Sequence, residues 1–364
     1  MEIKLLGKSK IIMSNPYSKH NYFAWPTATR LQNGKIAVVA SGFRLEHVCP
    51  FGKTVISYSE DDGETYTLPA PVIDTVLDDR DGGIVPFGKS GVIVTSFNNS
   101  IEFQKFRMQN RPLNSEYKSA YLELITKEEE SKYLGALFRF SFDGGVTFGP
   151  ICKSHITSPH GPIELKDGSL LWVGRTFSHM DAKMGSNDRI EAHKINLDGT
   201  TEFVGYIDNV VEDGEELLSC EPHVILLDDG RLLAHIRVQR NTGERILTIY
   251  QSESNDNGKT WSKPYRLLDK FGGAPSHLFR HSSGVLIATY GVRKFPYGIK
   301  AMFSYDDGKT WDIGHDIYVN EVSADLGYPS TVELKDGSLI TVFYAREKAE
   351  ESTVIMQQKW EIVK

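Results

Sequence analysis

The stretch SEDDGETY, from Ser59 to Tyr66, decides how this chain folds, because nearly the same eight residues return three more times. The copies are SFDGGVTF at 141–148, SNDNGKTW at 254–261 and SYDDGKTW at 304–311. All four fit the pattern S-x-D-x-G-x-T-aromatic. An aspartate in such a turn accepts backbone N–H groups, and glycine permits a tight bend. We call these four stretches box turns, and we interpret them as turns that fasten structural repeats together rather than as catalytic sites.

A second phrase recurs between the box turns: an apolar run, a short turn that often reads D-G or N-G, and another apolar run. It predicts two strands joined by a tight hairpin, because D-G and N-G supply the positive φ angles that such turns require. The phrase occurs six times, beginning at Trp25, Asp81, His160, Glu221, Ala274 and Gly327. Six hairpins, each followed by another strand or two, predict an all-β, six-bladed β-propeller, with each box turn after the third strand of its blade.

The predicted propeller occupies residues 1–364 as a single domain. A charged, helix-like segment at about 100–134 is expected as an insertion in blade two. The run from Ile3 to Met13 is expected to pair with TVIMQQKWEIV near the C-terminus, so that the ring closes and its open edges disappear. Blade three keeps only a remnant of the box, INLDGT at 195–200.

The composition, with 40% hydrophobic and 24% charged residues, is typical of a globular protein. A net charge of −7 argues against nucleic-acid binding. The N-terminus lacks a signal-peptide core and no stretch approaches membrane-spanning length, so we expect a cytoplasmic protein with no membrane partner. Three scattered cysteines do not predict a disulfide framework, and no C-x-x-C spacing supports a metal site. Neither a metal nor a cofactor is expected.

In a propeller, the start of each first strand and the end of each second strand meet on one face, around the central channel. A concave binding site is expected there. The candidate side chains at these positions are Trp25, Arg44, His47, Arg80, Asp81, His160, Arg175, Glu221, His223, Arg237, His277, Arg293 and Tyr328. Five arginines at the centre of an acidic protein favour an anionic or heavily hydroxylated ligand. The predicted partner is therefore a glycan or oligosaccharide.

The box turns, the six blades and the central residues together resemble the sialidase superfamily, with its BNR or Asp-box repeats, over essentially the whole chain. The resemblance implies a tyrosine nucleophile that opens blade six and a glutamate partner that opens blade four. Tyr328 in GYPS and Glu221 in CEPH match these positions. Arg237 and Arg293 match the second and third arginines of a carboxylate clamp.

The activity that the resemblance implies is exo-glycoside hydrolysis of a sialylated or other acidic glycan. An anomeric carbon that bears a carboxylate repels an anionic nucleophile, so a phenol activated by an adjacent carboxylate suits this reaction. Tyr328 would act as the nucleophile and Glu221 as its activator.

Two positions depart from the pattern of the family. The phrase that should carry the first arginine reads FAWPT, with Ala24 and Trp25 at or near its place. The segment LEHVCPFGK contains no aspartate where the family has its acid/base. Glu46, His47 or Asp81 could supply the proton instead, and the sequence does not choose among them. Losing one arm of the clamp should cost a few kcal/mol of specificity, on the order of one charged hydrogen bond.

Two other functions stay open. One is a different propeller glycosidase, or a lyase that uses His and Tyr on a uronate-containing glycan. The other is a carbohydrate-binding propeller without catalysis, suggested by Ala24 and the missing aspartate. Each candidate residue also has a structural explanation: Tyr328 could pack beside the channel, Glu221 and Arg237 could form an ion pair, and the histidines could be neutral and hydrogen-bonded.

Overall fold

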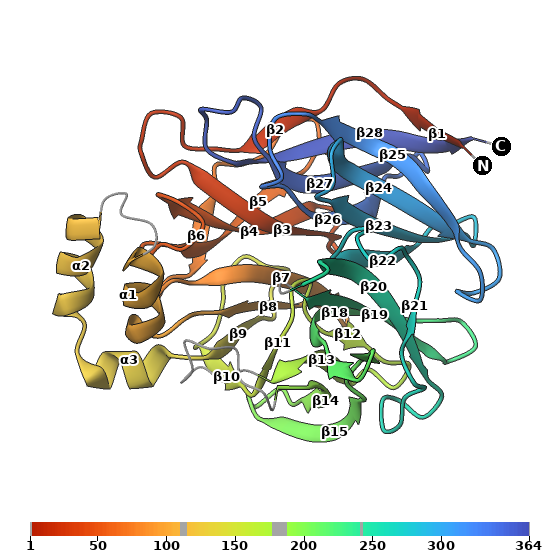
Figure 1. The fold of residues 1–364 in the computed structure, drawn as a ribbon, viewed down its shortest axis with the longest axis horizontal. Coiled ribbons are helices and arrows are strands. Elements are labelled where there is room, and N and C mark those ends of the chain that lie inside the picture. Colours follow the sequence, from red (N-terminus) through yellow and green to blue (C-terminus); the bar gives the residue numbers. More distant parts are fainter. Residues whose placement is uncertain (1, 110–114, 177–187, 241–242, 364) are drawn as a thin grey trace.

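The computed structural model describes residues 2–109, 115–176, 188–240 and 243–363, and it confirms a six-bladed β-propeller (Figure 1). Each blade is an antiparallel sheet whose first strand is innermost. Blade one contains β3 (Tyr22–Arg30), β4 (Ile36–Arg44), β5 (Lys53–Ser59) and β6 (Ala70–Ile73). Blade two contains β7 (Arg80–Phe87), β8 (Gly91–Phe97), β9 (Ala136–Ser141) and β10 (Cys152–Ser154). Blade three contains β11 (Ile156–Thr157), β12 (Ile163–Glu164), β13 (Leu170–Thr176), β14 (Ile190–Ile195) and β15 (Thr201–Ile207).

The second half of the chain repeats this plan. Blade four contains β18 (Leu218–Leu226), β19 (Leu232–Arg240), β20 (Ile246–Ser254) and β21 (Tyr265–Arg266). Blade five contains β22 (Ser276–Arg280), β23 (Leu286–Val292), β24 (Tyr297–Ser304) and β25 (Asp312–Asn320). Blade six contains β26 (Gly327–Glu333), β27 (Leu339–Ala345), β28 (Val354–Val363), β1 (Glu2–Leu5) and β2 (Lys10–Met13). A small hairpin, β16 (Val211–Glu212) and β17 (Glu215–Glu216), precedes blade four.

The N-terminal strands close the ring, as the sequence predicts. Both β1 and β2 pair antiparallel with β28, with Leu5 opposite Trp360 and Lys10 opposite Gln357. Figure 1 shows the two ends of the chain side by side at blade six. Because these strands cover β28, the last sheet presents no long unpaired edge there.

The box turns fasten neighbouring blades. In the fourth box, Asp306 accepts hydrogen bonds from Thr310 N (2.9 Å), Thr310 Oγ1 (2.6 Å) and Ser304 Oγ (2.8 Å). The bonds from Thr310 are the main cause that lowers the pKa of Asp306 to about 2. Gly308 packs directly on Leu233 of blade four, and Trp311 Nε1 donates to Gln251 Oε1 at 2.9 Å in that blade.

The other box turns follow the same design. Asp61, Asp143 and Asp256 each accept from the N–H and hydroxyl of the threonine four residues on. Tyr66 OH, beside the first box, donates to Gln357 Oε1 of blade six at 2.7 Å. Because third strands run parallel to first strands, all box turns lie at the end of the ring opposite to where the first strands begin.

Three histidines meet at the centre of the ring. The ring centroids of His160, His223 and His277, from three different blades, lie 4.6–5.0 Å apart. The Nδ1 atoms of His223 and His277 accept backbone N–H groups of Leu278 and Thr331, so both rings carry their proton on Nε2. Burial lowers the pKa of His223 to about 3, and it lowers the pKa of His160 and His277 as well.

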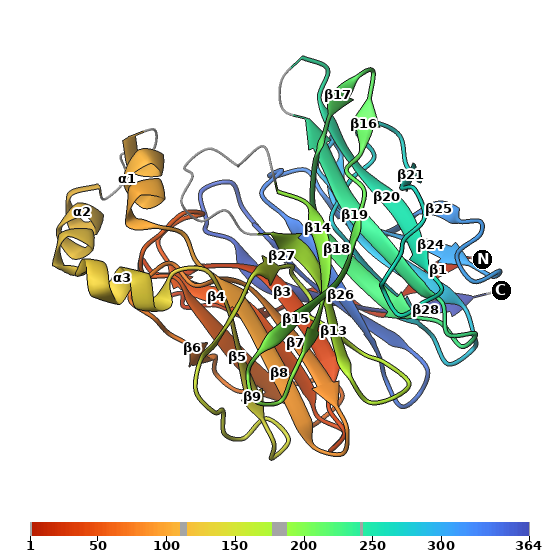
Figure 2. The ribbon, with the colours of Figure 1, turned by 90° about the horizontal axis from the view of Figure 1, so that it is seen from below.

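Helices α1 (Ile101–Gln109), α2 (Ser115–Leu124) and α3 (Lys127–Tyr133) lie between β8 and β9 of blade two, where the sequence predicts an insertion. Gln104 of α1 donates to Asp78 Oδ2 at 2.9 Å, and buried Lys118 of α2 pairs with Glu46. Figure 2 shows the helices on one side of the molecule and the β16–β17 hairpin on the other. Among the described helices, none is long and apolar enough to cross a membrane.

Replacing Gly308 with alanine should destabilise the protein more than replacing Gly284. Both glycines have a positive φ, +82° and +88°, so both variants bear a similar backbone strain of about 1–2 kcal/mol. Only at Gly308 would the new Cβ meet a neighbouring blade, 2.1 Å from Leu233 Cδ1. We expect a further loss of about 1–3 kcal/mol for that variant in urea denaturation. Equal losses would show that the box turn does not fasten the blades.

The central histidines should make the fold sensitive to mild acid. Above their ordinary pKa of 6.5 they are neutral in both folded and unfolded chains. Below it, the histidine binds a proton in the unfolded chain but not in the folded one, where His223 is buried. The free energy of unfolding is therefore at its full value above pH 6.5 and falls as the pH drops. Each such histidine should cost about 2 kcal/mol at pH 5. The variant His223→Asn keeps an acceptor for Leu278 N, and its free energy of unfolding should vary less steeply between pH 7 and 5; an unchanged slope would contradict this.

Candidate active site

Four inner strands present a side chain to the centre through the same backbone distortion. Trp25, Asp81, Glu221 and Tyr328 have φ angles of 54°, 46°, 49° and 50°, and each lies where a β-bulge interrupts pairing with the second strand. A positive φ is unfavourable for residues other than glycine, and such strain is concentrated at functional sites. In the sequence, each of the four is followed by proline or glycine.

Tyr328 and Glu221, the pair predicted from the sequence, are in direct contact. The Tyr328 hydroxyl donates to Glu221 Oε1 at 2.6 Å. Arg237 Nη1 donates to Glu221 Oε2 at 2.7 Å and to Tyr328 OH at 3.1 Å. Burial, and next the charge of Glu221, raise the pKa of Tyr328 well above 10, so the resting phenol keeps its proton. Glu221 is placed to receive that proton when the phenol attacks.

Two guanidinium groups flank this phenol. Arg237 is held by Gln239, whose Oε1 accepts from Arg237 Nε at 3.0 Å. The Cζ atom of Arg293 lies 6.0 Å from the centroid of the Tyr328 ring. Arg293 Nη2 donates to the Tyr344 hydroxyl at 3.2 Å, which orients the group. Both arginines of the predicted clamp therefore lie beside the nucleophile candidate.

The other three arginines have protein partners of their own. Arg44 has no exposed side-chain surface and forms an ion pair with buried Asp78 at 2.5 Å. Its expected role in ligand binding therefore does not fit its position, because Asp78 draws the guanidinium into the core. Arg80 Nη1 donates to His47 O at 3.0 Å, with 8% of its side chain exposed. Arg175 pairs with Asp188.

Trp25 fills the place where the first arginine of the clamp is expected. Its ring contacts those of Tyr328, Tyr344 and His47, with centroids 6.5, 6.1 and 4.9 Å away. Arg80 lies over the indole, with Cζ 4.3 Å from the ring centroid, in a cation–π contact. A buried neutral ring thus stands where the resemblance leads us to expect a cation.

The three candidates for the missing acid/base lie in different surroundings. Glu46 pairs with Lys118 of α2 and is engaged by the helical insertion. Asp81 is buried, which raises its pKa to about 7, and its Oδ1 has no hydrogen-bond partner among the described residues. His47 has 34% of its side chain exposed, and burial of the ring lowers its pKa to about 4.

Three histidines that the sequence predicts at the binding site lie deeper in the ring than the pair of Tyr328 and Glu221. His160, His223 and His277 lie deeper in the channel, and His223 is two residues beyond Glu221 on β18. They line a cavity of about 510 Å³ that extends along the inner strands.

Sequence reasoning missed Tyr22, whose hydroxyl is 3.1 Å from both His47 Nδ1 and Asp325 Oδ1. Its position three residues before Trp25 was the available signal.

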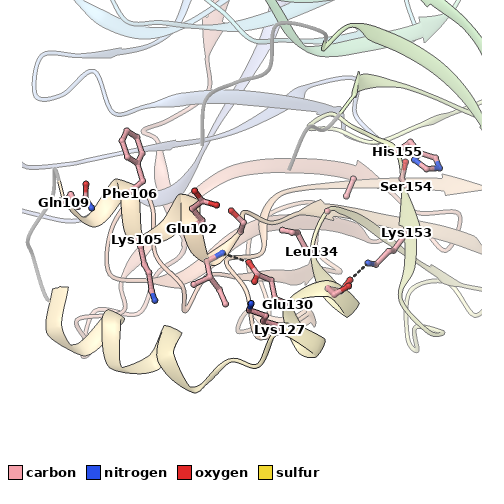
Figure 3. Close-up of a pocket in the computed structure, with 15 residues that line it drawn as sticks. Glu102, Lys105, Phe106, Gln109, Lys127, Glu130, Leu134, Lys153, Ser154 and His155 are labelled. Carbon is pink, nitrogen blue, oxygen red and sulfur yellow. Dashed lines mark hydrogen bonds between the residues drawn. The ribbon is translucent and has the colours of Figure 1, made fainter. Parts of the chain in front are cut away.

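A separate cavity lies beside the helical insertion (Figure 3). It has a volume of about 970 Å³ and is lined by α1, α3 and the outer part of blade two. Glu130 Oε1 accepts from Ile101 N at 2.8 Å, and Lys153 Nζ donates to Ser131 O at 2.8 Å. The central residues, from Trp25 to Tyr328, do not line it.

Comparison with known proteins agrees with the repeats and the ring. The model of the BNR repeat-like domain family matches residues 140–342. Sialidase-2 from Cricetulus griseus is 28% identical over 122 residues, which cover 28% of this chain and 32% of that protein. The matched part thus spans about a third of this curated relative.

Solved structures of similar fold cover nearly the whole chain. A protein of unknown function from Dyadobacter fermentans has a TM-score of 0.72 at 20% identity, covering 99% of both chains. The NanB sialidase from Streptococcus pneumoniae has a TM-score of 0.66 at 13% identity, covering 99% of this chain and 71% of that one. An α-L-arabinanase from Penicillium chrysogenum has a TM-score of 0.61 at 13% identity, covering 99% and 98%. These identities show a shared fold only. With its family model matched over more than half of the residues, this chain belongs to the BNR repeat-like domain family.

Proposed function

We propose that this protein is a sialidase-like exo-glycoside hydrolase that acts on an acidic glycan. The observation that carries the proposal is the 2.6 Å hydrogen bond from Tyr328 to Glu221, with Arg237 joined to both. The family and the sialidases among its structural relatives support a glycosidase on this scaffold.

The arrangement accounts for each step that the protein must assist. The phenol of Tyr328 attacks the anomeric carbon while its proton passes to Glu221, so that no anion has to approach an anionic substrate. Arg237 stabilises the carboxylate of Glu221 before the transfer and the developing phenolate during it. Arg293, whose Cζ lies 6.0 Å from the centroid of the Tyr328 ring, is available to a substrate carboxylate.

A different propeller glycosidase is the second candidate, and one observation favours it. Trp25, which is buried, occupies the position of the first arginine, so the substrate carboxylate would meet two cations of the clamp rather than three. The loss of one cation is compatible with a neutral or differently substituted acidic glycan. The arabinanase among the structural relatives shows that this fold also serves other glycosides.

Replacing Tyr328 with phenylalanine should abolish turnover while the fold survives, because the ring stays and only the nucleophilic oxygen is lost. We expect kcat to fall roughly 1,000-fold or more on the substrate that a panel of nitrophenyl glycosides, including the sialoside and the arabinoside, identifies. Tyr290→Phe, which removes a hydroxyl from the buried Tyr290 of blade five, is the matched control. Turnover by the Tyr328 variant equal to that of the control would remove the proposed role of the phenol.

A further inference from the structure

A three-residue relay lies at the blade-one edge of the site, built from distant parts of the chain. Tyr22 OH donates to both oxygens of Asp325, at 3.1 and 3.2 Å, and lies 3.1 Å from His47 Nδ1. Arg346 Nη2 donates to Asp325 Oδ2 at 3.3 Å. Asp325 stands three residues before Tyr328, so the loop that carries the relay also carries the nucleophile candidate.

The relay fixes where His47 carries its proton. Burial by itself would raise the pKa of Asp325, but the neighbouring His47, with Nδ1 3.9 Å from Asp325 Oδ1, and Arg346 hold it at about 2, so Asp325 is ionised. The Tyr22 hydroxyl therefore uses its one proton to donate a hydrogen bond to this carboxylate. The Tyr22 oxygen can then only accept from His47 Nδ1–H, which leaves Nε2 as the free, reactive nitrogen of a neutral ring.

We propose that His47 is the acid/base of the glycosidase reaction, in place of the missing aspartate, and that Tyr22 and Asp325 are its positioning residues. This inference rests on the proposed function. His47 Nε2–H gives its proton to the glycosidic oxygen as that bond breaks and the bond from Tyr328 to the anomeric carbon forms. In the second step, water attacks that carbon, its proton passes to Nε2, and Tyr328 leaves and recovers its proton from Glu221.

Exposure distinguishes His47 from Asp81 for this role. In an exo-acting enzyme the leaving group points toward solvent, so its proton donor must be accessible to solvent. His47 has 34% of its side chain exposed, whereas Asp81 has 7%. His47 contacts the buried ring of Trp25 edge-on, and that ring in turn contacts Tyr328 (centroids 4.9 and 6.5 Å).

The charges around His47 set the direction of its pH response. The groups that face it are Tyr22, Arg44, Arg80 and Asp325. The pKa of His47 is lowered to about 4: burial is the largest influence, Arg80 and Arg44 act in the same direction, and Asp325 opposes them. The first step needs the protonated ring, so kcat/KM should rise as the pH falls from 7 toward 4. Removing the charge of Asp325 should move this rise, the acidic limb of the pH–rate profile, to lower pH.

The first test compares leaving groups in the full-length protein. His47→Gln should keep kcat/KM within about 10-fold for a nitrophenyl glycoside, whose leaving group needs no proton. It should lose roughly 100-fold or more for the matching saccharide glycoside. Asp325→Asn and Tyr22→Phe should shift the pH limb, which a merely structural role would not move. His315→Gln, on the outer strand β25, is the control.

The outcomes separate this inference from the proposed function. Equal losses on both substrates, or none on either, would overturn the role of His47, provided that Tyr328→Phe is inactive. An active Tyr328→Phe would instead overturn the hydrolase mechanism itself. A measurement without substrate completes the test: ¹⁵N NMR of the histidines should show His47 protonated at Nδ1, and Tyr22→Phe should lose this preference. A proton on Nε2 in the unaltered protein would refute the relay.

Discussion

Closure of the ring is the constraint on which the rest of this structure depends. Blade one and blade six come from opposite ends of the chain, and their contact brings Trp25 beside Tyr328. Ser330 Oγ of blade six accepts from Ala28 N of blade one at 3.0 Å. A continuous apolar cluster that includes Phe23 and Tyr344 joins the two inner hairpins. Without the N-terminal strands on β28, this apolar cluster and a few hydrogen bonds, such as that from Phe23 N to Thr353 O at 2.9 Å, would have to hold the circle.

The centre of the ring concentrates unfavourable groups, and they can be kept there because the blades around it are rigid. Non-glycine residues adopt a left-handed backbone, carboxylates lie near a buried phenol, and neutral histidines stack below them. Each feature opposes folding by itself. The apolar interfaces between blades and the fully hydrogen-bonded box turns supply the stabilising free energy that offsets their cost.

Repeated and local features of this protein could be predicted from its sequence. Box turns and D-G hairpins are local, so the number of blades and the facing ends of their strands could be counted, and Tyr328 and Glu221 were correctly brought together. The side-chain partners of Arg44 could not be predicted in this way. Its ion pair is with Asp78, 34 residues away on the connection into the next blade, and no periodic pattern links them. The relay of Tyr22, His47 and Asp325 likewise spans 303 positions.

The separation between the box turns and the central site has a consequence for how such proteins diversify. The turns that secure the blades stand at one end of the ring, while the connection from β8 to β9 that carries α1–α3 leaves from the other. Segments can therefore be lengthened or exchanged at the reactive end without disturbing the joints. The ligand specificity of such a propeller can therefore change in evolution while its fold is kept.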